Sequence, residues 1–556
     1  MTTGLLLSKI ASRCGYQVFD YIEYPSLIRG GHNAYEVAAG DDPISCLHDQ
    51  IDILVCLNSE TFNLHQARLA DDALVVFDPE QFKPLLKNHW QGVAVPMGKM
   101  VSEGRGQPVM RNTVALGASI ALMGGEMALV ETILRDQFNK KGEAVIQFNI
   151  GFARQGYQHV KDHASGYGRS YLAAPQSAAQ LVLSGNEAFA LGAVVGDCRC
   201  YVAYPMTPAS SVLTVLAAWQ AQTGMVVRHA EDELAAINTA IGAGFAGARS
   251  AVGTSGGGFA LMVETISLAG VSETPVVIFL AQRPGPATGM PTWTEQGDLL
   301  FAVHAGHGEF PKIVLAPGDV AEMVQLTAQA FNLADIYQLP VIVMSEMYLS
   351  ESHATLSQTE LDRIISDYQV KRGKTITKVD GSSYQRYKIS PDGISERLIP
   401  GTADFYFQAN SYEHKEDGHT SEAAADRVAQ VDKRMRKLTT YLSQDYQLPT
   451  LYGDWQKAKT VLVGWGGIKG ILLEVMRRLP DVAVMHFHHL YPLAADRLKP
   501  LLTQDKRYVL IENNATGQFG KLLLQEAGLA VGEKILRYDG RPLTVGEIMK
   551  KLSQSV

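Results

Sequence analysis

A threonine between two prolines is the first feature of this chain that could do chemistry. The segment YPMTP, residues 204–208, follows a short apolar stretch and precedes a run with helical spacing. Proline fixes φ and restricts the residue before it, so this strand-to-helix turn holds one conformation around the Thr207 hydroxyl. With the free N–H groups of the following helix, that hydroxyl suits an anion. A capping turn that binds nothing is the alternative.

An arginine at the end of another apolar run suits the same chemistry. The segment PVVIFLAQRPGPATGMPT places Arg283 at the carboxyl end of a strand predicted to be buried, directly before Pro284. Its guanidinium is a planar fork that fits a carboxylate, and a surface salt bridge is the plain alternative. Ligands of open parallel sheets bind beyond the carboxyl ends of the strands. Thr207 and Arg283 at one such edge therefore favour a site for a small anion.

Acidic residues and glycines form a third group. Residues 231–233, with the sequence EDE, open a helix, whose dipole stabilises carboxylates without any further function. Gly242-x-Gly244-x-x-Gly247 has the form of a dinucleotide fingerprint but lies within that helix and not directly after a strand. We therefore interpret these glycines as sites of close helix packing. The glycines at 256–258 do follow a strand and could let a ligand approach the backbone.

The elements that must position these residues alternate between apolar runs and helical stretches. Over residues 166–360 this pattern predicts a parallel sheet covered on both faces. A first α/β unit, residues 1–165, precedes it, and a third, residues 456–556, ends the chain. Between them, residues 361–455 are polar and charged, and we expect a linker or insertion that ends in an exposed helix rich in charge pairs. Residues 156–180, poor in large apolar side chains, are predicted to be a linker.

Composition narrows the class of protein. With 556 residues, 46% hydrophobic and 19% charged, the chain is typical of a soluble globular protein of several domains. A net charge of −8 without a basic block argues against nucleic acid as a partner. Neither a membrane-length apolar run nor a signal-peptide pattern is present, so we expect the cytoplasm. The five cysteines include no CxxC, and the histidines lack metal-ligand spacing, so no metal site is predicted in this chain.

Long segments of the chain resemble one family, the 2-oxoacid:ferredoxin oxidoreductases, and specifically a fused γ–α chain of the 2-oxoglutarate type. In the middle of the chain the resemblance rests on SGNEAFALGA, YPMTPASS, EDELAAINTAIGAGFAGARSAVGTSGGGFALM and QRPGPATGMPTWTEQGDL. EYPSLIRGGHN resembles the γ part, and ENNATGQFGKLLL with RYDGRPLTVGEI resembles the α carboxyl domain. The resemblance implies three α/β units: a γ-type domain, a pyrimidine-binding domain for thiamine diphosphate and a transketolase C-terminal-like domain.

The resemblance also implies a reaction. A 2-oxoacid is oxidatively decarboxylated on thiamine diphosphate, coenzyme A takes the acyl group and ferredoxin takes the electrons. By alignment of EDELAAI, Glu233 corresponds to the family's glutamate that bonds the aminopyrimidine ring and helps to activate the cofactor. Thr207 and Arg283 fall on positions that hold the substrate carboxylate, with Thr292 as a neighbour. A small anionic substrate must be aimed at a fixed atom, which explains why two prolines hold Thr207 still.

Further binding residues follow from the same resemblance, and part of the site falls to a partner. Ser26 is placed with the substrate-binding residues, and Tyr204, Pro205 and Gly256 with those that bind the cofactor. The sequence has no GDG…N diphosphate–magnesium motif and no set of cluster cysteines. We therefore expect Mg2+ and a 4Fe-4S cluster on a separate β subunit, in a dimer of γα/β units that reduces ferredoxin. The chain starts at MTTGLLLSKI, and we expect that the family's first strand and glycine-rich loop are missing.

Two other functions remain open. A subunit of a non-oxidative thiamine enzyme would need the same pyrimidine domain but no cluster-bearing partner. A non-catalytic subunit would use the carboxylate site only for sensing. The oxoacid is also open between 2-oxoglutarate, pyruvate and others, because the residue that would hold a second carboxylate is not identified. The joint presence of Thr207, Glu233 and Arg283 favours the oxidoreductase.

Overall fold

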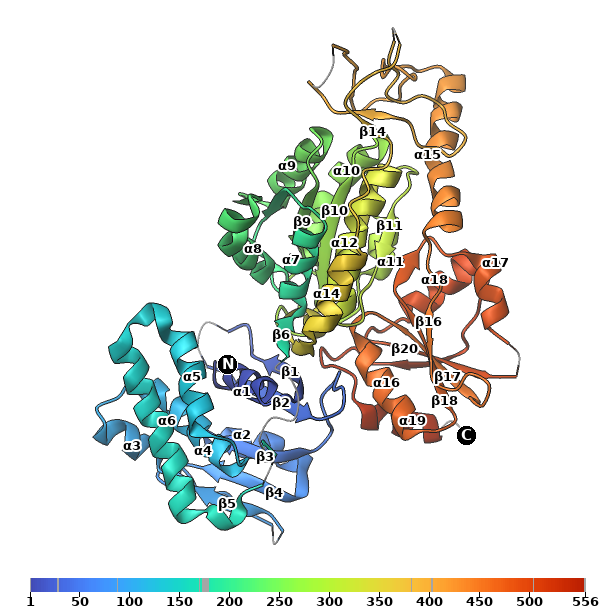
Figure 1. Ribbon diagram of the computed structural model, residues 1–556. Helices are drawn as coiled ribbons and strands as arrows, with labels where there is room; N and C mark the ends of the chain where they lie inside the picture. The colour runs from blue at the N-terminus through green and yellow to red at the C-terminus, as the bar shows by residue number, and fades with distance from the viewer. Residues whose placement is uncertain are drawn as a thin grey trace. The chain divides into compact units, whose positions relative to one another are not determined.

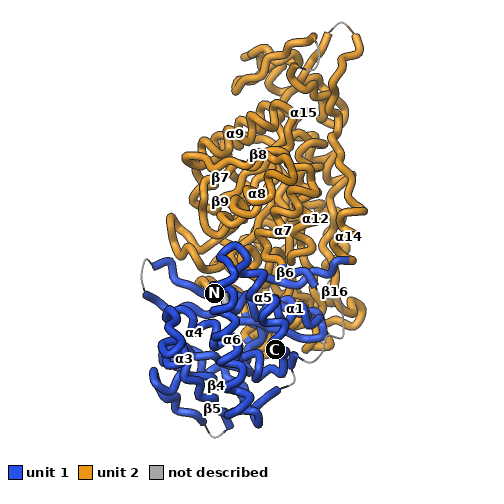
Figure 2. The backbone as a smooth tube through the Cα atoms, turned by 60° about the vertical axis from the view of Figure 1, so that its left-hand side comes forward, with its two compact units in different colours: residues 1–182, 353–358, 544–546 blue, residues 183–352, 359–543, 547–556 orange. Residues whose placement is uncertain are grey.

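A mixed α/β architecture with mostly parallel sheets confirms the predicted fold class in the computed structural model of the chain (Figure 1). The structure describes residues 2–27, 30–87, 89–169, 171–172, 180–381, 383–401, 404–503 and 505–554. It has two compact units (Figure 2): unit 1 contains residues 1–182, 353–358 and 544–546, and unit 2 contains residues 183–352, 359–543 and 547–556. The finer division into four segments stays a prediction.

Unit 1 carries two small sheets. β1 (Gln17–Glu23) pairs antiparallel with β2 (Ala34–Gly40) and with β13 (His353–Leu356), which comes from the middle of the chain. The other sheet has the parallel order β3-β4-β5, formed by β3 (Ile51–Cys56), β4 (Leu69–Phe77) and β5 (Gln91–Ala94). The helices of this unit are α1 (Thr2–Arg13), α2 (Ser59–His65), α3 (Met97–Glu103), α4 (Arg111–Leu122), α5 (Met127–Phe138) and α6 (Glu143–His163).

Helix α6 corrects the linker that the sequence predicted from residue 156. The helix continues to His163 and buries Val160. A Cβ atom added at Gly156 would lie 2.0 Å from the Val114 carbonyl oxygen, so this glycine allows α4 and α6 to approach closely. Gly156, one of the small residues that favour a linker in the sequence, is thus a contact point between two helices. Residues 173–179, within the same prediction, lie outside the described residues.

The large sheet of unit 2 has seven strands in the order β19-β11-β12-β10-β9-β7-β8. All its pairings are parallel except that of β19 with β11. Every residue of β10 and β12 is buried, as expected for central strands with both faces covered. The strands are β7 (Cys200–Ala203), β8 (Val226–His229), β9 (Ser250–Thr254), β10 (Val276–Gln282), β11 (Ile313–Leu315), β12 (Pro340–Glu346) and β19 (His489–Tyr491); β6 (Leu181–Ser184) lies just before them in the chain.

Helices cover this sheet, and they pack in pairs, α7 with α12 and α9 with α10. Helix α7 begins with a capping box, in which the Ser184 hydroxyl and the Glu187 carboxylate satisfy each other's backbone N–H groups. The helices are α7 (Gly185–Val195), α8 (Ser210–Thr223), α9 (Glu233–Phe245), α10 (Gly256–Val271), α11 (Leu299–His304), α12 (Val320–Tyr337), α13 (Met347–Glu351) and α14 (Gln358–Asp367).

The three glycines that have the form of a dinucleotide fingerprint, at positions 242, 244 and 247, have different roles. A Cβ atom at Gly244 would lie 2.4 Å from the Pro275 carbonyl oxygen, which confirms close packing there. Gly242 has nothing within 4 Å, so the packing interpretation is wrong for it. Helix α9 ends at Phe245, and Gly247 follows it with φ of +95°, a left-handed conformation that favours glycine.

A five-stranded sheet, β16-β18-β17-β20-β21, forms the carboxyl-terminal part of unit 2. Its strand β16 is antiparallel and the other pairings are parallel. The intervening strand β19 leaves this sheet and joins the edge of the seven-stranded one. The elements are β16 (Thr450–Tyr452), β17 (Thr460–Trp465), α16 (Lys469–Arg478), β18 (Val482–Phe487), α17 (Ala495–Leu498), β20 (Arg507–Glu512), α18 (Gln518–Ala527), β21 (Glu533–Leu536) and α19 (Val545–Gln554).

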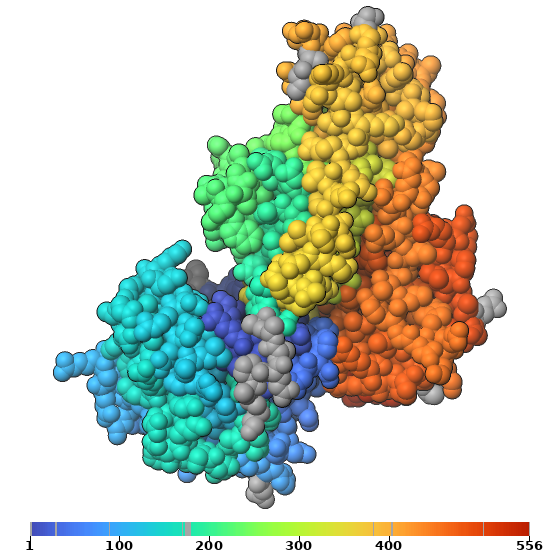
Figure 3. All heavy atoms as spheres, viewed as in Figure 1, coloured from blue at the N-terminus to red at the C-terminus, as the bar shows by residue number. Residues whose placement is uncertain are grey.

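The charged segment forms the short strands β14 (Thr375–Ile376) and β15 (Arg397–Leu398) and the helix α15 (Ala424–Gln444), orange in Figures 1 and 3. The predicted helix is confirmed, but it is not exposed on all sides, because one face of it is buried. The side chains of Lys433 and Lys437 are fully buried, and each ammonium lies 2.6 Å from a carboxylate oxygen of Glu273. Buried charges must be paired, and here the partner lies 160 positions before Lys433 in the sequence.

Candidate active site

Parallel strands end at one edge of the seven-stranded sheet, and the residues singled out in the sequence follow them. β7 leads into the YPMTP turn, β9 into the glycines at 256–258 and β10 into Arg283. β12 ends at Glu346, which pairs in register with Gln282. Because carboxyl ends of parallel strands lie together, these segments share the edge at which open α/β sheets bind ligands.

The YPMTP turn is held from two directions. Asn186, a buried residue of α7, donates from Nδ2 to the Pro208 carbonyl oxygen and to the Ser211 hydroxyl, each at 2.7 Å. Arg283 donates from Nη1 to the Thr207 carbonyl oxygen at 2.8 Å. The structure therefore brings Thr207 and Arg283 together. That they hold a substrate carboxylate stays a prediction.

The three acidic residues of EDE lie in different environments. Glu231 is exposed, whereas Asp232 is the N-cap of α9 and accepts a hydrogen bond from the Ala235 N–H at 2.7 Å. Glu233, the first residue of the helix, is only 3% exposed, and its Oε1 has no hydrogen-bond partner among the described residues. A buried polar atom without a partner is costly. Of the three, Glu233 is the one placed to meet a ligand.

The role of Asp232 as the N-cap of α9 can be tested by its effect on stability while Glu233 is kept. We expect Asp232→Ala to lower the free energy of unfolding by about 1 kcal/mol, because the first turn of α9 loses its acceptor. Asp232→Asn keeps an acceptor oxygen and should retain most of that stability. Denaturant unfolding of the two variants measures the difference, and equal losses would contradict the capping role.

Two glycines in the first turn of α10 make room for carboxylates. A Cβ atom at Gly256 would lie 2.5 Å from Asp298 Oδ2, and one at Gly258 would lie 2.5 Å from Glu233 Oε1. Ser255, the residue before this helix, has a buried hydroxyl without a partner among the described residues. The turn therefore lies between two carboxyl groups. The predicted contact of Gly256 with a cofactor stays a prediction.

Two glutamines hold the loop that follows β10 in place through hydrogen bonds. Gln282 Oε1 accepts from the Asp298 N–H at 2.9 Å. Gln296 Nε2 donates to the Trp465 carbonyl oxygen at 2.8 Å, and its Oε1 accepts from the Asn513 N–H at 2.9 Å. Sequence reasoning missed both glutamines, because no local pattern identifies their partners, which lie 16 positions from Gln282 and 217 positions from Gln296.

Two carboxyl groups that sequence reasoning also missed add charge to this edge. Burial raises the pKa of Asp298 to about 6, although the positive charge of Arg283 opposes the rise. Burial, and after it the charge of Asp298, raises the pKa of Glu295 to about 7. Burial lowers the pKa of Arg283, and Asp298 opposes that change. In the sequence both acids belong to TEQGDL, where nothing distinguishes them from surface residues.

The remaining predicted site residues have less informative positions. Thr292 is buried in the loop after β10, being only 4% exposed. Tyr204 is 39% exposed, and its ring lies 6.1 Å from that of His229; Pro205 is exposed. Ser26 is exposed in the loop after β1, in unit 1. Their predicted roles in binding stay predictions.

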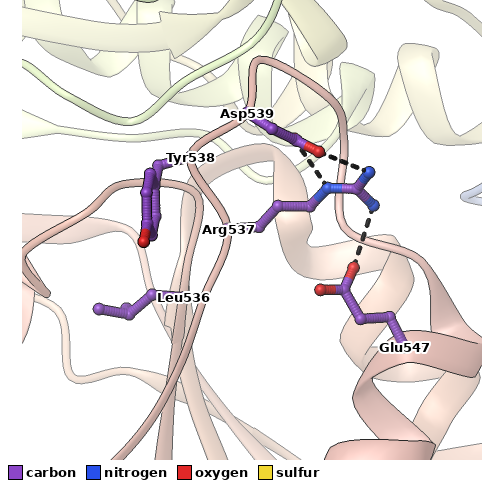
Figure 4. A pocket seen from close by; sticks show the side chains of 5 residues that line it. All are labelled: Leu536, Arg537, Tyr538, Asp539 and Glu547. Atoms are coloured by element: carbon purple, nitrogen blue, oxygen red, sulfur yellow. Dashed lines mark hydrogen bonds and ion pairs between the residues drawn. The ribbon is translucent and has the colours of Figure 1, made fainter.

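A surface pocket of about 380 Å³ lies elsewhere in unit 2 and is lined by Leu536, Arg537, Tyr538, Asp539 and Glu547 (Figure 4). The Arg537 guanidinium bonds Asp539 at 2.9 Å and Glu547 at 3.0 Å, so two carboxylates already use its charge. Within the described ranges, no group of three or more His, Cys, Asp or Glu side chains could hold a metal ion. These features leave the edge at Glu233 and Arg283 as the candidate site.

Known proteins are similar to this chain in sequence and in fold. The family model described as pyruvate flavodoxin/ferredoxin oxidoreductase, thiamine diP-bdg, matches residues 191–433, and pyruvate ferredoxin/flavodoxin oxidoreductase matches residues 1–159. The 2-oxoacid:ferredoxin oxidoreductase subunit alpha of Sulfolobus sp is 32% identical over 99% of this chain and 94% of that protein. The 2-oxoglutarate oxidoreductase subunit KorA of Mycobacterium tuberculosis is 27% identical over 94% and 84%.

A solved structure matches as well. The 2-oxoglutarate:ferredoxin oxidoreductase from Magnetococcus marinus, with 2-oxoglutarate, coenzyme A and succinyl-CoA bound, has a TM-score of 0.91 and 30% identity. The match covers 100% of this chain and 96% of that one. Among the described helices, none combines the length and the apolar character that crossing a membrane requires.

Proposed function

The chain belongs to the 2-oxoacid:ferredoxin oxidoreductase family, as an alpha subunit, and on this premise we propose that it oxidatively decarboxylates 2-oxoglutarate together with a β subunit. In the proposed reaction coenzyme A takes the succinyl group and ferredoxin takes the electrons. The observation that carries the proposal is the buried Glu233 Oε1, which lacks a partner among the described residues and lies at the same sheet edge as Arg283.

The residues of this edge fit thiamine diphosphate. Glu233 Oε1 is buried and free to bond a ring nitrogen, and Gly258 leaves it the space that a Cβ atom would fill. When bound, the cofactor supplies the nucleophilic carbon and the electron sink that decarboxylation of a 2-oxoacid needs. The role of Glu233 is to hold a proton at Oε1, and because this residue is only 3% exposed, a hydrogen bond to a charged group is strong there.

Arg283 and Thr207 are proposed to orient the substrate. The Arg283 Nη1 is anchored at the Thr207 carbonyl oxygen, and the rest of the guanidinium fork is half-buried. A fork held in this way can bind a carboxylate in one orientation. The Thr207 hydroxyl adds a donor from a turn that Asn186 keeps in place. When the substrate carboxylate is held in place, the keto carbon is held in place as well. This positioning supplies the entropic contribution to catalysis.

The choice of 2-oxoglutarate rests on relatives. The M. tuberculosis relative and the solved structure are both named for 2-oxoglutarate, while the matching family models are named for pyruvate. Pyruvate or another 2-oxoacid is therefore the alternative substrate. The second carboxylate of 2-oxoglutarate needs a further cation or donor, and no described residue is assigned to it.

The β subunit is proposed to complete the site with Mg2+ and a 4Fe-4S cluster. Large apolar side chains are exposed next to the site: Leu234, which follows Glu233, is 45% exposed, and Leu261 on the neighbouring helix α10 is 50% exposed. Apolar surface beside a cofactor group is typical of a surface that a partner covers. This supports docking of the β subunit at α9 and α10.

Reconstitution tests the proposal. We expect the isolated chain to reduce neither ferredoxin nor a viologen with any 2-oxoacid, and the complex with its β subunit to do so in the presence of thiamine diphosphate and coenzyme A. A panel of 2-oxoglutarate, pyruvate and other oxoacids should give the highest kcat/KM for 2-oxoglutarate. Turnover by the chain alone would contradict the shared site. A complex without iron that decarboxylates without reducing an acceptor would favour the non-oxidative alternative.

A further inference from the structure

Asp298 is an N-cap residue that does not cap its helix. It precedes α11, and its side chain accepts no hydrogen bond from that helix. Two other aspartates of this chain in the same position do cap: Asp232 accepts from the Ala235 N–H at 2.7 Å and Asp319 from the Glu322 N–H at 2.8 Å. Because aspartate is a favoured cap, a carboxylate that points elsewhere needs another explanation.

The carboxylate of Asp298 points into the candidate site. Its Oδ2 is buried, has no hydrogen-bond partner among the described residues and lies 2.5 Å from the position of a Cβ atom at Gly256. The Asp298 N–H is fixed by Gln282 Oε1 at 2.9 Å. The residue is therefore held at the end of β10, and Arg283 begins the loop directly after that strand.

The charged groups that face Asp298 are few. β10 leads into Arg283, whose positive charge attracts the carboxylate, and the loop carries Glu295, whose charge repels it. Helix α10 presents the uncharged Gly256, and Gln518 of α18 bonds the neighbouring backbone at Gly297 and Leu300. Burial raises the pKa of Asp298 to about 6, so the group can change its charge near neutral pH.

We propose that Asp298 competes with the substrate carboxylate for Arg283 and must be neutral when an anionic 2-oxoacid is bound. This inference rests on the proposed function of Arg283. Asp298 already interacts with the charge of the half-buried Arg283, and a substrate carboxylate bound there would repel it, so the cheaper state protonates the carboxylate that stays in the protein. Asp298 is then a positioning residue that sets the affinity of the site for anions, and substrate binding takes up a proton.

The direction of the pH effect follows from linkage. If the pKa of Asp298 is higher with substrate bound than without it, affinity is full below the lower pKa and falls as the pH rises above it. The free site has its pKa at about 6. KM for the oxoacid should therefore rise as the pH increases above about 6.5, with a slope that approaches about tenfold per pH unit for one proton taken up.

The test compares the wild-type complex with Asp298→Asn, which keeps the size and removes the charge. We expect the KM of the variant to lose most of its dependence on pH and, at pH 8, to be about ten- to a hundredfold lower than that of the wild type. Glu295→Gln separates the two loop carboxyls and should leave most of the pH dependence in place. Asp162→Asn, the same change at an exposed position of α6 in unit 1, should behave as wild type.

A second measurement needs no variant. Calorimetric titration of the wild-type complex with 2-oxoglutarate, in buffers with different ionisation enthalpies, should report uptake of up to one proton at pH 7. A KM with the same pH dependence in Asp298→Asn, a variant with a raised KM at every pH, or binding without proton uptake would overturn the inference. If the wild type turns over the oxoacid with a pH-independent KM, this inference fails and the proposed function stands. If no oxoacid is turned over, both fail.

Discussion

Replacing Glu233 with Gln in the assembled enzyme should lower kcat by about 10²–10⁴-fold, the range lost when general acid–base help is removed. Gln keeps the shape but cannot hold and return a proton at Oε1. Stability should change little, because that oxygen has no hydrogen-bond partner among the described residues and a carboxylate at a helix N-terminus contributes only about 0.3–1 kcal/mol. Steady-state kinetics with ferredoxin or a viologen and thermal melts of the same preparation measure both effects.

The matched control for this change lies two positions away. Glu231→Gln makes the same substitution at an exposed carboxylate and should leave kcat within about twofold of the wild type, as expected for a surface position without a partner role. Thiamine diphosphate binding, measured by titration, should weaken in Glu233→Gln and not in Glu231→Gln. A crippled Glu231 variant beside a mild Glu233 variant would move the assignment to the other acid.

The residues of the site that could be predicted are those that stand in a recognisable local sequence pattern. Apolar runs followed by YPMTP, EDE and QRPGP show where strands end, and parallel topology then brings those ends to one edge. The bond from Arg283 to Thr207 agrees with that expectation. The choice of Glu233 within EDE came from the family resemblance, and burial now supplies a physical reason for it.

Asp298 could not be found in this way. An aspartate before a short helix is expected to cap it, and only the three-dimensional structure shows that its carboxylate faces Gly256 instead. For Gly256 the sequence predicts a contact with the cofactor. A glycine after a strand indicates that some group lies close to the backbone, but it does not identify that group.

The errors in the fold have a related cause. The charge-rich sequence of α15 is typical of an exposed helix, but Lys433 and Lys437 are buried and pair with Glu273, which lies 160 positions before Lys433. The small residues after 156 are typical of a linker, but Gly156 is the place where α6 meets α4. The composition of a segment predicts only its average exposure. A single partner that is distant in the sequence can cause individual side chains to be buried.

Arg283→Lys should lower kcat/KM by about ten- to a hundredfold, although the charge is kept. The arginine uses Nη1 for the Thr207 carbonyl oxygen and has further N–H donors for a carboxylate. A lysine ammonium is a point donor on a mobile stem and cannot hold both partners in the geometry of a fork. A charge-assisted hydrogen bond contributes roughly 1.5–3 kcal/mol, which corresponds to the expected loss.

Thr207→Val completes the test, because it removes the hydroxyl and keeps the carbonyl oxygen that anchors Arg283. Its own effect should be smaller than that of Arg283→Lys, and the double variant should lose less than the sum, since both groups act on one anion. Melting temperatures should barely change in any of the three. Strictly additive losses, or losses of activity that follow a drop in melting temperature, would make Arg283 a structural clamp of the YPMTP turn and not a ligand of the substrate.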